Sequence, residues 1–206
     1  MKKRLLSLVL VGLLLAGCGG NSDRADVIGN SGLQNEENGA TAEETTDAGE
    51  NAAEAATEQV YVLKFTDAVT IDGGKMSADV FANAKLTMIN VWATFCGPCI
   101  NEMPDLGEIA GAYDAAEFQM IGIVSDAIEG DEAMIAEAKE IIEETGANYT
   151  HLLLNEELYM NLVGASDSVP TTYFFNQKGE LLGYLVGAQS KANWEGIIDG
   201  LLEELE

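Results

Sequence analysis

From residue 59 onward, apolar residues occur either in continuous runs or at helical spacing. Two stretches, 85–93 and 118–125, are apolar almost throughout, which is typical of central strands buried on both faces. Over 131–146, apolar residues recur every three or four positions, and Gly146 follows the last of them. This pattern predicts an amphipathic helix that ends at the glycine. The second part of the chain therefore combines buried strands with helices.

Shorter patterns complete the order of elements. Near-alternate apolar residues predict a strand at 59–65, and Asp72–Gly74 predict the tight turn of a hairpin within 68–77. A helix is expected at 97–115, kinked where Pro104 lacks an amide donor. The remaining predictions are a strand at 150–154, a helix at 155–165, a β-hairpin at 171–187 and a helix at 190–205 in which Trp194 has core spacing.

Alternation of strands and helices implies parallel pairing through right-handed crossovers, and the last hairpin adds antiparallel strands. The predicted fold class is α/β, with a mixed central sheet flanked by helices and an N-terminal β-hairpin extension. Residues 59–206 are expected to form this single domain, which is long enough to bury one core.

The first 18 residues, MKKRLLSLVLVGLLLAGC, place three positive charges before an apolar run that ends at Ala16. This is the layout of an export signal, and the run is shorter than the roughly 20 residues of a membrane-spanning helix. The ending LAGC resembles the bacterial lipoprotein signal, which implies cleavage before Cys18 and lipidation of that residue. Residues 1–18 are thus expected to be a lipoprotein signal peptide, and acyl chains to hold the mature chain on a membrane.

Residues 19–58 contain no aromatic residue and carry ten acidic residues against one Arg. Such a segment cannot bury enough apolar surface to fold, so it is predicted to be a disordered acidic tether. The whole chain has a formal net charge of −25. Because phosphate binding depends on clusters of Lys and Arg, this charge argues against a nucleic acid partner.

Cys96 and Cys99 lie in the stretch NVWATFCGPCINEMP, where a buried strand ends and a helix begins. Free amide donors at a helix N-terminus stabilise a thiolate, which suits Cys96 to attack a disulfide. Pro98 fits the first helical turn. A zinc site needs about four ligands, and only the lone His151, expected to be structural, could join the two thiols. An inert disulfide would close almost no loop. A redox pair is therefore expected, with no metal and no cofactor beyond the Cys96–Cys99 disulfide.

These motifs resemble the thioredoxin fold and, within it, the membrane-tethered extracytoplasmic thiol–disulfide oxidoreductases of the TlpA/ResA/CcmG group. The likeness covers about residues 60–206 and depends on three features. They are Trp92–Thr94 before the redox pair, Glu102 and Pro104 after it, and Val169–Thr171 at the start of a strand.

The resemblance implies roles for the residues around the pair. Cys96 would attack, Cys99 would resolve the mixed disulfide, and Pro170 would be a cis-proline facing them, a rare and therefore functional backbone feature. The Val169 backbone would pair with the substrate chain as an added strand. Substrate contacts are expected from Trp92, Phe95, Gly97, Pro98, Val169, Pro170 and Thr171.

Two positions depart from the family pattern. Thioredoxins proper carry a buried Asp six residues before the first cysteine, where this chain has Asn90, which cannot accept a proton. Glu102, one helical turn after Cys99, is therefore the candidate for proton transfer, since partial burial raises the pKa of a carboxyl. A solvated acid on the helix surface is the alternative for Glu102. Phe95 replaces the usual Trp and should keep an apolar collar around Cys96.

The leading interpretation is a lipid-anchored thioredoxin-like reductase of disulfides in exported proteins. Because no cationic side chain lies between the cysteines, a low reduction potential is expected. By resemblance, the substrate would be apocytochrome c or a peroxide or methionine-sulfoxide repair enzyme. A transmembrane thiol carrier of the CcdA/DsbD kind would supply the electrons.

The protein would act as a monomer at the outer face of the cytoplasmic membrane, on the cell membrane or in the periplasm. Two alternatives stay open: a disulfide-forming oxidase of the same fold, and a non-catalytic peptide-binding or chaperone module. A peroxidase is disfavoured because no Pro/Thr pair at peroxidase spacing precedes either cysteine.

Overall fold

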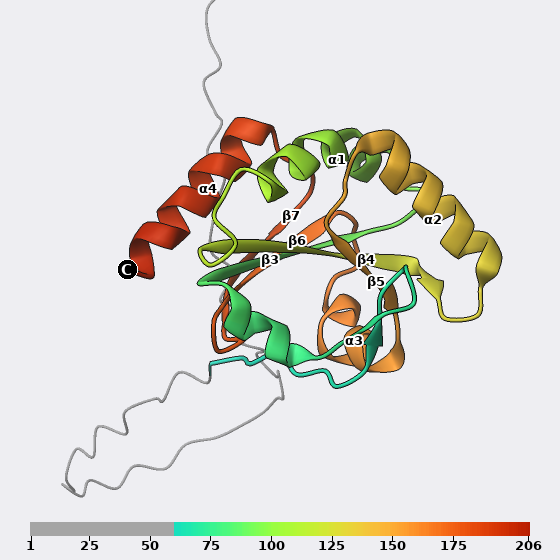
Figure 1. Ribbon diagram of the computed structural model, residues 1–206, viewed down its shortest axis with the longest axis horizontal. Coiled ribbons are helices and arrows are strands. Elements are labelled where there is room, and N and C mark those ends of the chain that lie inside the picture. Colours follow the sequence, from blue (N-terminus) through green and yellow to red (C-terminus); the bar gives the residue numbers. More distant parts are fainter. Residues whose placement is uncertain (1–59) are drawn as a thin grey trace, which may run out of the picture. The chain divides into compact units, whose positions relative to one another are not determined.

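The structure is a computed structural model and describes residues 60–206 (Figure 1). The predicted signal peptide with Cys18 and the predicted tether lie outside the described residues. The elements are β1 (Ala68–Val69), β2 (Lys75–Met76), η1 (Ala78–Asn83), β3 (Leu86–Trp92), α1 (Gly97–Ala110), β4 (Phe118–Ile128), α2 (Glu132–Thr145), β5 (Thr150–Leu154), α3 (Glu156–Asn161), η2 (Val163–Ala165), β6 (Thr171–Asn176), β7 (Leu181–Val186) and α4 (Lys191–Glu204).

A five-stranded mixed sheet in the order β5-β4-β3-β6-β7 forms the centre of the domain. The pairs β3–β4 and β4–β5 are parallel, whereas β3–β6 and β6–β7 are antiparallel. The strands β1 and β2 form a separate antiparallel pair ahead of the sheet. The predicted α/β class, with its mixed sheet, flanking helices and N-terminal hairpin, is therefore confirmed.

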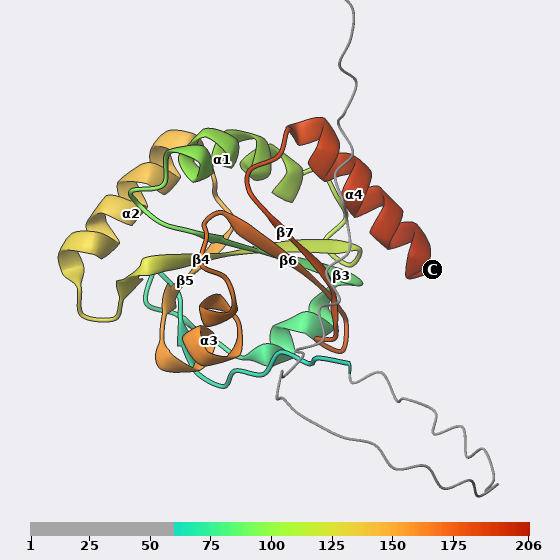
Figure 2. The ribbon, with the colours of Figure 1, turned by 180° about the vertical axis from the view of Figure 1, so that it is seen from behind.

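Helices cover both faces of the sheet, as Figures 1 and 2 show from opposite sides. The helices α1, α2 and α4 lie on one face, and α3 and η1 lie on the other. Side chains of β3 alternate between the two: Ile89 and Val91 pack in the cluster with α3, whereas Met88 and Trp92 pack toward α1. All seven residues of β3 are buried, as expected for a central strand covered on both faces.

The best-patterned helix forms with the predicted limits. Asp131 caps the start of α2 by accepting the amide of Met134 at 3.2 Å. Gly146 ends the helix in the left-handed region, with φ of 69°. Helix α1 begins as predicted but ends at Ala110, and it continues through Pro104.

The structure changes two sequence-based expectations and adds one helix that was not predicted. The predicted strand at 59–65 contributes only one bridge, between Val62 and Glu180. The helix expected at 155–165 is split into α3 and η2. The short helix η1 was not predicted. Phe81 is its buried residue, and a segment this short shows no apolar period.

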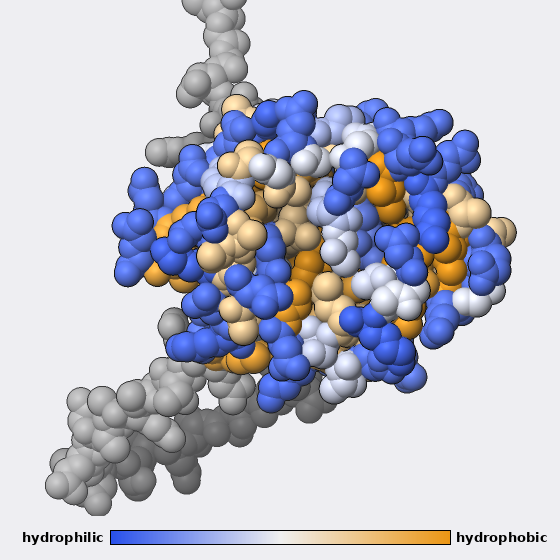
Figure 3. All heavy atoms as spheres, viewed as in Figure 1, coloured by the Kyte–Doolittle hydropathy of each residue, from blue (hydrophilic) through white to orange (hydrophobic). Residues whose placement is uncertain are grey.

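The outer surface agrees with the acidic composition. Hydrophilic residues predominate in Figure 3, and apolar residues emerge between them in separate patches. The ion pair between Lys75 and Asp67 is exposed on both sides, with side-chain exposures of 68% and 61%. Exposed pairs of this kind add little stability, so the core and the sheet hold the domain together.

Candidate active site

Cys96 and Cys99 lie at the point where the loop after β3 turns into α1. They form a disulfide with a Cα–Cα distance of 5.3 Å. Cys96 is the N-cap residue of α1, and its sulfur accepts the amide of Cys99 at 3.3 Å. A sulfur that faces free amide donors at a helix start is stabilised as a thiolate once the disulfide is reduced.

The two sulfur-bearing residues differ in access. Cys96 is 5% exposed and Cys99 is fully buried. The residues around Cys96 are open: Phe95 is 78% exposed, and Gly97 and Pro98 lie at the surface. A partner disulfide can therefore reach Cys96 first, whereas Cys99 lies behind it in the core.

The peptide bond between Val169 and Pro170 is cis. Val169 is partly buried and packs against the apolar cluster that contains both cysteines. It also lines the same pocket as Phe95, the residue before Cys96. Pro170 itself is buried, and its carbonyl accepts the amide of Gly187 at 2.8 Å. The structure thus brings together Cys96, Cys99 and the Val169–Pro170 bond.

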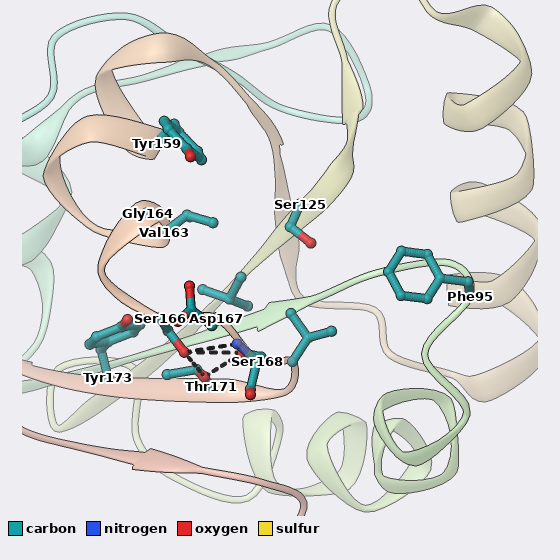
Figure 4. Close-up of a pocket in the computed structure, with 12 residues that line it drawn as sticks. Phe95, Ser125, Tyr159, Val163, Gly164, Ser166, Asp167, Ser168, Thr171 and Tyr173 are labelled. Atoms are coloured by element: carbon teal, nitrogen blue, oxygen red, sulfur yellow. Dashed lines mark hydrogen bonds between the residues drawn. The ribbon is translucent and has the colours of Figure 1, made fainter.

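A pocket of about 250 Å³ lies between Phe95 and the proline loop (Figure 4). Its wall is rich in hydroxyl groups, among them those of Ser125, Tyr159 and Ser166, and its one charged lining residue is Asp167. Phe95 projects toward it from the loop before α1, opposite the residues of α3 and the proline loop. Phe95, Val169 and Thr171 of this lining were among the predicted substrate contacts. The hydroxyl-bearing residues escaped the sequence analysis because they are scattered along the chain and form no motif.

The loop at 166–171 is braced from within. The hydroxyl of Thr171 donates to the carbonyl of Ser168 at 2.7 Å, and it lies 2.8 Å from the hydroxyl of Ser166. Figure 4 draws these bonds as a small network under the pocket. Thr171 is 1% exposed, so it contributes to the pocket mainly by fixing the loop.

Glu102 is buried, with an exposure of 4%. Its Oε1 accepts the side-chain amide of Asn90 at 3.3 Å. Its Oε2 accepts the backbone amide of Gln189 at 3.1 Å and the indole of Trp194 at 3.3 Å. Glu102 is therefore not a solvated surface acid, and the role of Trp194 as a donor was not visible from its core spacing.

Burial raises the pKa of Glu102 above its ordinary value, and the three hydrogen bonds that it accepts oppose this effect. As residues three apart on a helix are neighbours, the carboxyl lies on the same side of α1 as Cys99. A buried carboxyl with a raised pKa beside a thiol is suited to take up and return a proton.

Trp92 does not lie where the sequence analysis put it. It was expected to contact substrate, but its side chain is fully buried, so it has no surface to offer. Its indole donates to Nδ1 of His151 at 3.2 Å, and Nε2 of His151 lies 2.9 Å from the carbonyl of Ala147. Trp92 is therefore a core residue beneath the active site, and His151 is structural, as predicted.

The pKa of His151 makes stability depend on pH. Burial lowers it to about 4, against an opposing effect of the hydrogen bond with Ala147. The unfolded chain takes up this proton near pH 6.5 and the folded chain only near pH 4. The free energy of unfolding should therefore fall by about 3 kcal/mol as the pH drops through this window. Glu102, with its raised pKa, acts in the opposite direction.

Urea unfolding at several pH values measures the predicted fall in the free energy of unfolding, with His151→Gln as the matched variant. Glutamine keeps an acceptor for Trp92 and a donor for Ala147 but does not titrate. We expect the variant to lose the decline in stability between pH 6.5 and 4. Parallel curves for the two proteins would contradict the assignment.

Asp126 is a further residue that the sequence analysis missed. Its Oδ2 accepts both the backbone amide and the hydroxyl of Thr94, at 2.9 and 2.7 Å. These bonds fix the loop that carries Cys96. The signal was available, because Asp126 follows the apolar run of a parallel strand near its carboxyl end, where functional side chains gather.

Within residues 60–206, no group of three or more His, Cys, Asp or Glu side chains is arranged to hold a metal ion. Over the same range, no helix combines the length and apolar character needed to cross a bilayer.

Solved structures and curated proteins are similar to this chain. A thiol:disulfide interchange protein of the thioredoxin family from Chlorobium tepidum TLS superposes with a TM-score of 0.61 at 24% identity, covering 71% of this chain and 99% of its own. This likeness confirms the thioredoxin fold.

Two curated relatives carry names from the same class. The thiol-disulfide oxidoreductase ResA of Bacillus thuringiensis (strain Al Hakam) is 25% identical over 114 residues, which are 55% of this chain. The chain spans 62% of the length of that relative. The thioredoxin-like protein YneN of Bacillus subtilis (strain 168) is 27% identical over 130 residues, 63% of this chain and 72% of YneN.

A family model is also matched, over one continuous stretch of the chain. Residues 53–182 fit the model described as the AhpC/TSA family, and they include the disulfide, Glu102 and the cis-proline. Because this stretch is more than half of the chain, the chain belongs to the AhpC/TSA family.

Proposed function

We propose that the protein is an extracytoplasmic thiol–disulfide oxidoreductase that reduces disulfides of exported proteins. One observation carries the proposal: a disulfide lies at a helix start, and the residue before it, Phe95, lines a pocket together with the cis-proline loop. The names of ResA and YneN and the likeness to the interchange protein support the same class of reaction.

The reaction follows from the order of access. In the reduced protein, the Cys96 thiolate attacks one sulfur of the substrate disulfide and releases the other as a thiolate. Cys99 then gives its proton to Glu102 and attacks the sulfur of Cys96, which releases the second substrate thiolate and closes the Cys96–Cys99 disulfide. Two electrons pass to the substrate, and both of its thiolates take up protons.

The pair Gly97-Pro98 supports reduction as the main direction. Neither residue supplies a positive charge, and both lie at the surface. Without such a charge the thiolate form is less stabilised, so the dithiol is a better electron donor. A membrane-bound thiol carrier of the CcdA/DsbD kind would restore the dithiol.

Location and substrate belong to the same proposal. The signal LAGC supports a lipid anchor on Cys18, which would hold the domain on the outer face of the cytoplasmic membrane. The pocket beside Phe95 would receive a side chain next to the substrate cysteine, and the Val169 backbone would pair with the extended chain. Apocytochrome c and peroxide or methionine-sulfoxide repair enzymes are the substrate classes to compare.

The test is reduction of insulin by the full chain, together with its reduction potential in glutathione buffers. We expect catalysed precipitation of insulin and a potential near that of thioredoxin, about −270 mV. A potential near about −120 mV would instead identify the disulfide-forming oxidase. Binding of peptides without any reduction of insulin would identify the non-catalytic peptide-binding module.

Glu102→Gln should slow turnover by about 100-fold near neutral pH, because the amide cannot accept the proton of Cys99. The amide oxygen can still accept from Trp194 and Gln189, so the fold is expected to persist. The measurement is the pH profile of insulin reduction. Glu108→Gln is the control, since Glu108 is exposed on the same helix. Equal rates for both variants would remove Glu102 from the mechanism.

A further inference from the structure

Asn90 occupies the centre of the sheet, directly behind the active site. It is fully buried, and its backbone is paired with Gly122 on β4 and Thr172 on β6. Its side-chain nitrogen donates to Glu102 Oε1 at 3.3 Å and to Thr172 Oγ1 at 3.0 Å. Its side-chain oxygen, Oδ1, is buried and has no hydrogen-bond partner among the described residues. Such an atom is costly to bury, so its orientation calls for a reason.

The two oxygens of Glu102 have different surroundings. Oε2 faces the amide of Gln189 and the indole of Trp194, and both of these groups can only donate. A proton placed on Oε2 would point at two other protons. A neutral Glu102 therefore carries its proton on Oε1, which faces Asn90.

This placement creates a conflict with the amide of Asn90. In the arrangement seen, the nitrogen of Asn90 donates to Oε1, which suits an ionised carboxylate. Once Oε1 carries a proton, two donors face each other. A half-turn of the amide resolves the conflict, because Oδ1 then accepts the proton of Oε1. The hydroxyl of Thr172, an acceptor in the first arrangement, can rotate and donate to Oδ1 in the second.

We propose that the side-chain amide of Asn90 turns over each time Glu102 gains or loses its proton, and so provides a matching partner for both forms of the carboxyl. Asn90 is then a positioning residue that acts through Glu102. An aspartate here would itself titrate, and a leucine would leave both forms of Glu102 without a partner on this side.

The turn of the Asn90 amide also affects Thr172. Thr172 lies on β6, two residues after Pro170, so the direction of its hydroxyl hydrogen bond follows the protonation of Glu102. The donors to the other carboxyl oxygen come from the segment before α4 and from α4 itself. Protonation of Glu102 therefore changes a hydrogen bond on β6, the strand that begins directly after the cis-proline.

Other titratable groups near Glu102 do not replace Asn90. Asp105, on the same helix, and the buried hydroxyl of Tyr149, which precedes β5, interact with Glu102 through charge. Lys191 of α4 is paired with Glu108 instead. Among the hydrogen bonds of the described residues, only Asn90 donates to Oε1. The pH response of this site therefore depends on Asn90 and Glu102 together.

Nuclear magnetic resonance of the oxidised full chain tests the proposal. The carboxyl carbon of Glu102 reports its ionisation, and nuclear Overhauser contacts report how close the amide protons of Asn90 lie to the Thr172 methyl group. We expect these contacts at high pH and their loss at low pH, with the midpoint of the Glu102 titration. The amide of Asn161, which donates to the carbonyl of Lys64, should keep its contacts throughout.

The variant Glu102→Gln gives a second test that needs no titration. Trp194 and Gln189 should hold the glutamine oxygen, so its amide nitrogen would face Asn90 as a permanent donor. We expect Asn90 in the turned arrangement at every pH. Persistence of the Thr172 contacts in this variant, or in the unmodified protein while Glu102 titrates, would overturn the proposal, as would a Glu102 that does not titrate between pH 3 and 9. The amide turn serves catalysis only if Glu102 transfers protons as proposed. Because the experiment needs no turnover, the amide turn and the proposed function can fail separately.

Discussion

Cys99→Ser is expected to abolish turnover and to leave the substrate bound to Cys96 as a mixed disulfide. Cys96 is the more exposed of the two, and in the proposed mechanism it attacks first and the buried Cys99 releases the product. With serine at position 99, the second step has no nucleophile. Incubation of the reduced variant with a disulfide substrate, followed by a non-reducing gel and peptide mass mapping, should show an adduct on Cys96.

The matched control is the double variant Cys96→Ser/Cys99→Ser, which should form no adduct within the domain. Peptide mapping is needed because the chain also contains Cys18. The single variant Cys96→Ser should lose turnover without trapping a partner. If it instead trapped substrate on Cys99 as readily, the assignment of the attacking sulfur would be reversed.

Gly122→Ala is expected to cost about 3 kcal/mol of the free energy of unfolding. A Cβ atom at this position would lie 2.1 Å from Nδ1 of His151, far inside contact distance. The ring of His151 crosses β4 over this glycine, and it is fixed there by Trp92 and by the carbonyl of Ala147. The ring therefore cannot move without breaking a buried hydrogen bond.

The urea midpoint of unfolding measures this cost. Gly200→Ala is the control, since a Cβ there meets nothing within 4 Å and lies in α4. We expect this change to be neutral or to stabilise by up to about 1 kcal/mol, because alanine favours a helix. Equal midpoints for Gly122→Ala and the unmodified protein would show that the His151 ring has room to move.

Patterns that repeat along the chain predicted most of the fold. The buried strands 85–93 and 118–125 and the helix at 131–146 were visible because many residues share one period. The segment 59–65 has the composition of a strand, but its place at the rim leaves it one bridge to Glu180. Pairing partners, and not local composition, decide whether such an edge segment forms a strand.

The site also contains residues that the sequence predicted and residues that it did not. The cysteines and Pro170 were found because they stand in short motifs with a chemical reason for their spacing. The misplaced Trp92 shows the limit of such motifs, since a residue four positions before a reactive cysteine can point into the core. Two of the three donors to Glu102 come from residues 87 and 92 positions away, and no local pattern records that distance.

The bridge between Val62 and Glu180 also bears on how the domain is presented to its partners. Glu180 lies next to the end of β6, which is paired with the start of β3, whereas Cys96 follows the other end of β3. Val62 therefore lies at the end of the sheet opposite the redox pair. Under the proposed anchor on Cys18, the attachment would reach the domain away from Cys96, and substrate proteins could approach the disulfide from the other end of the sheet.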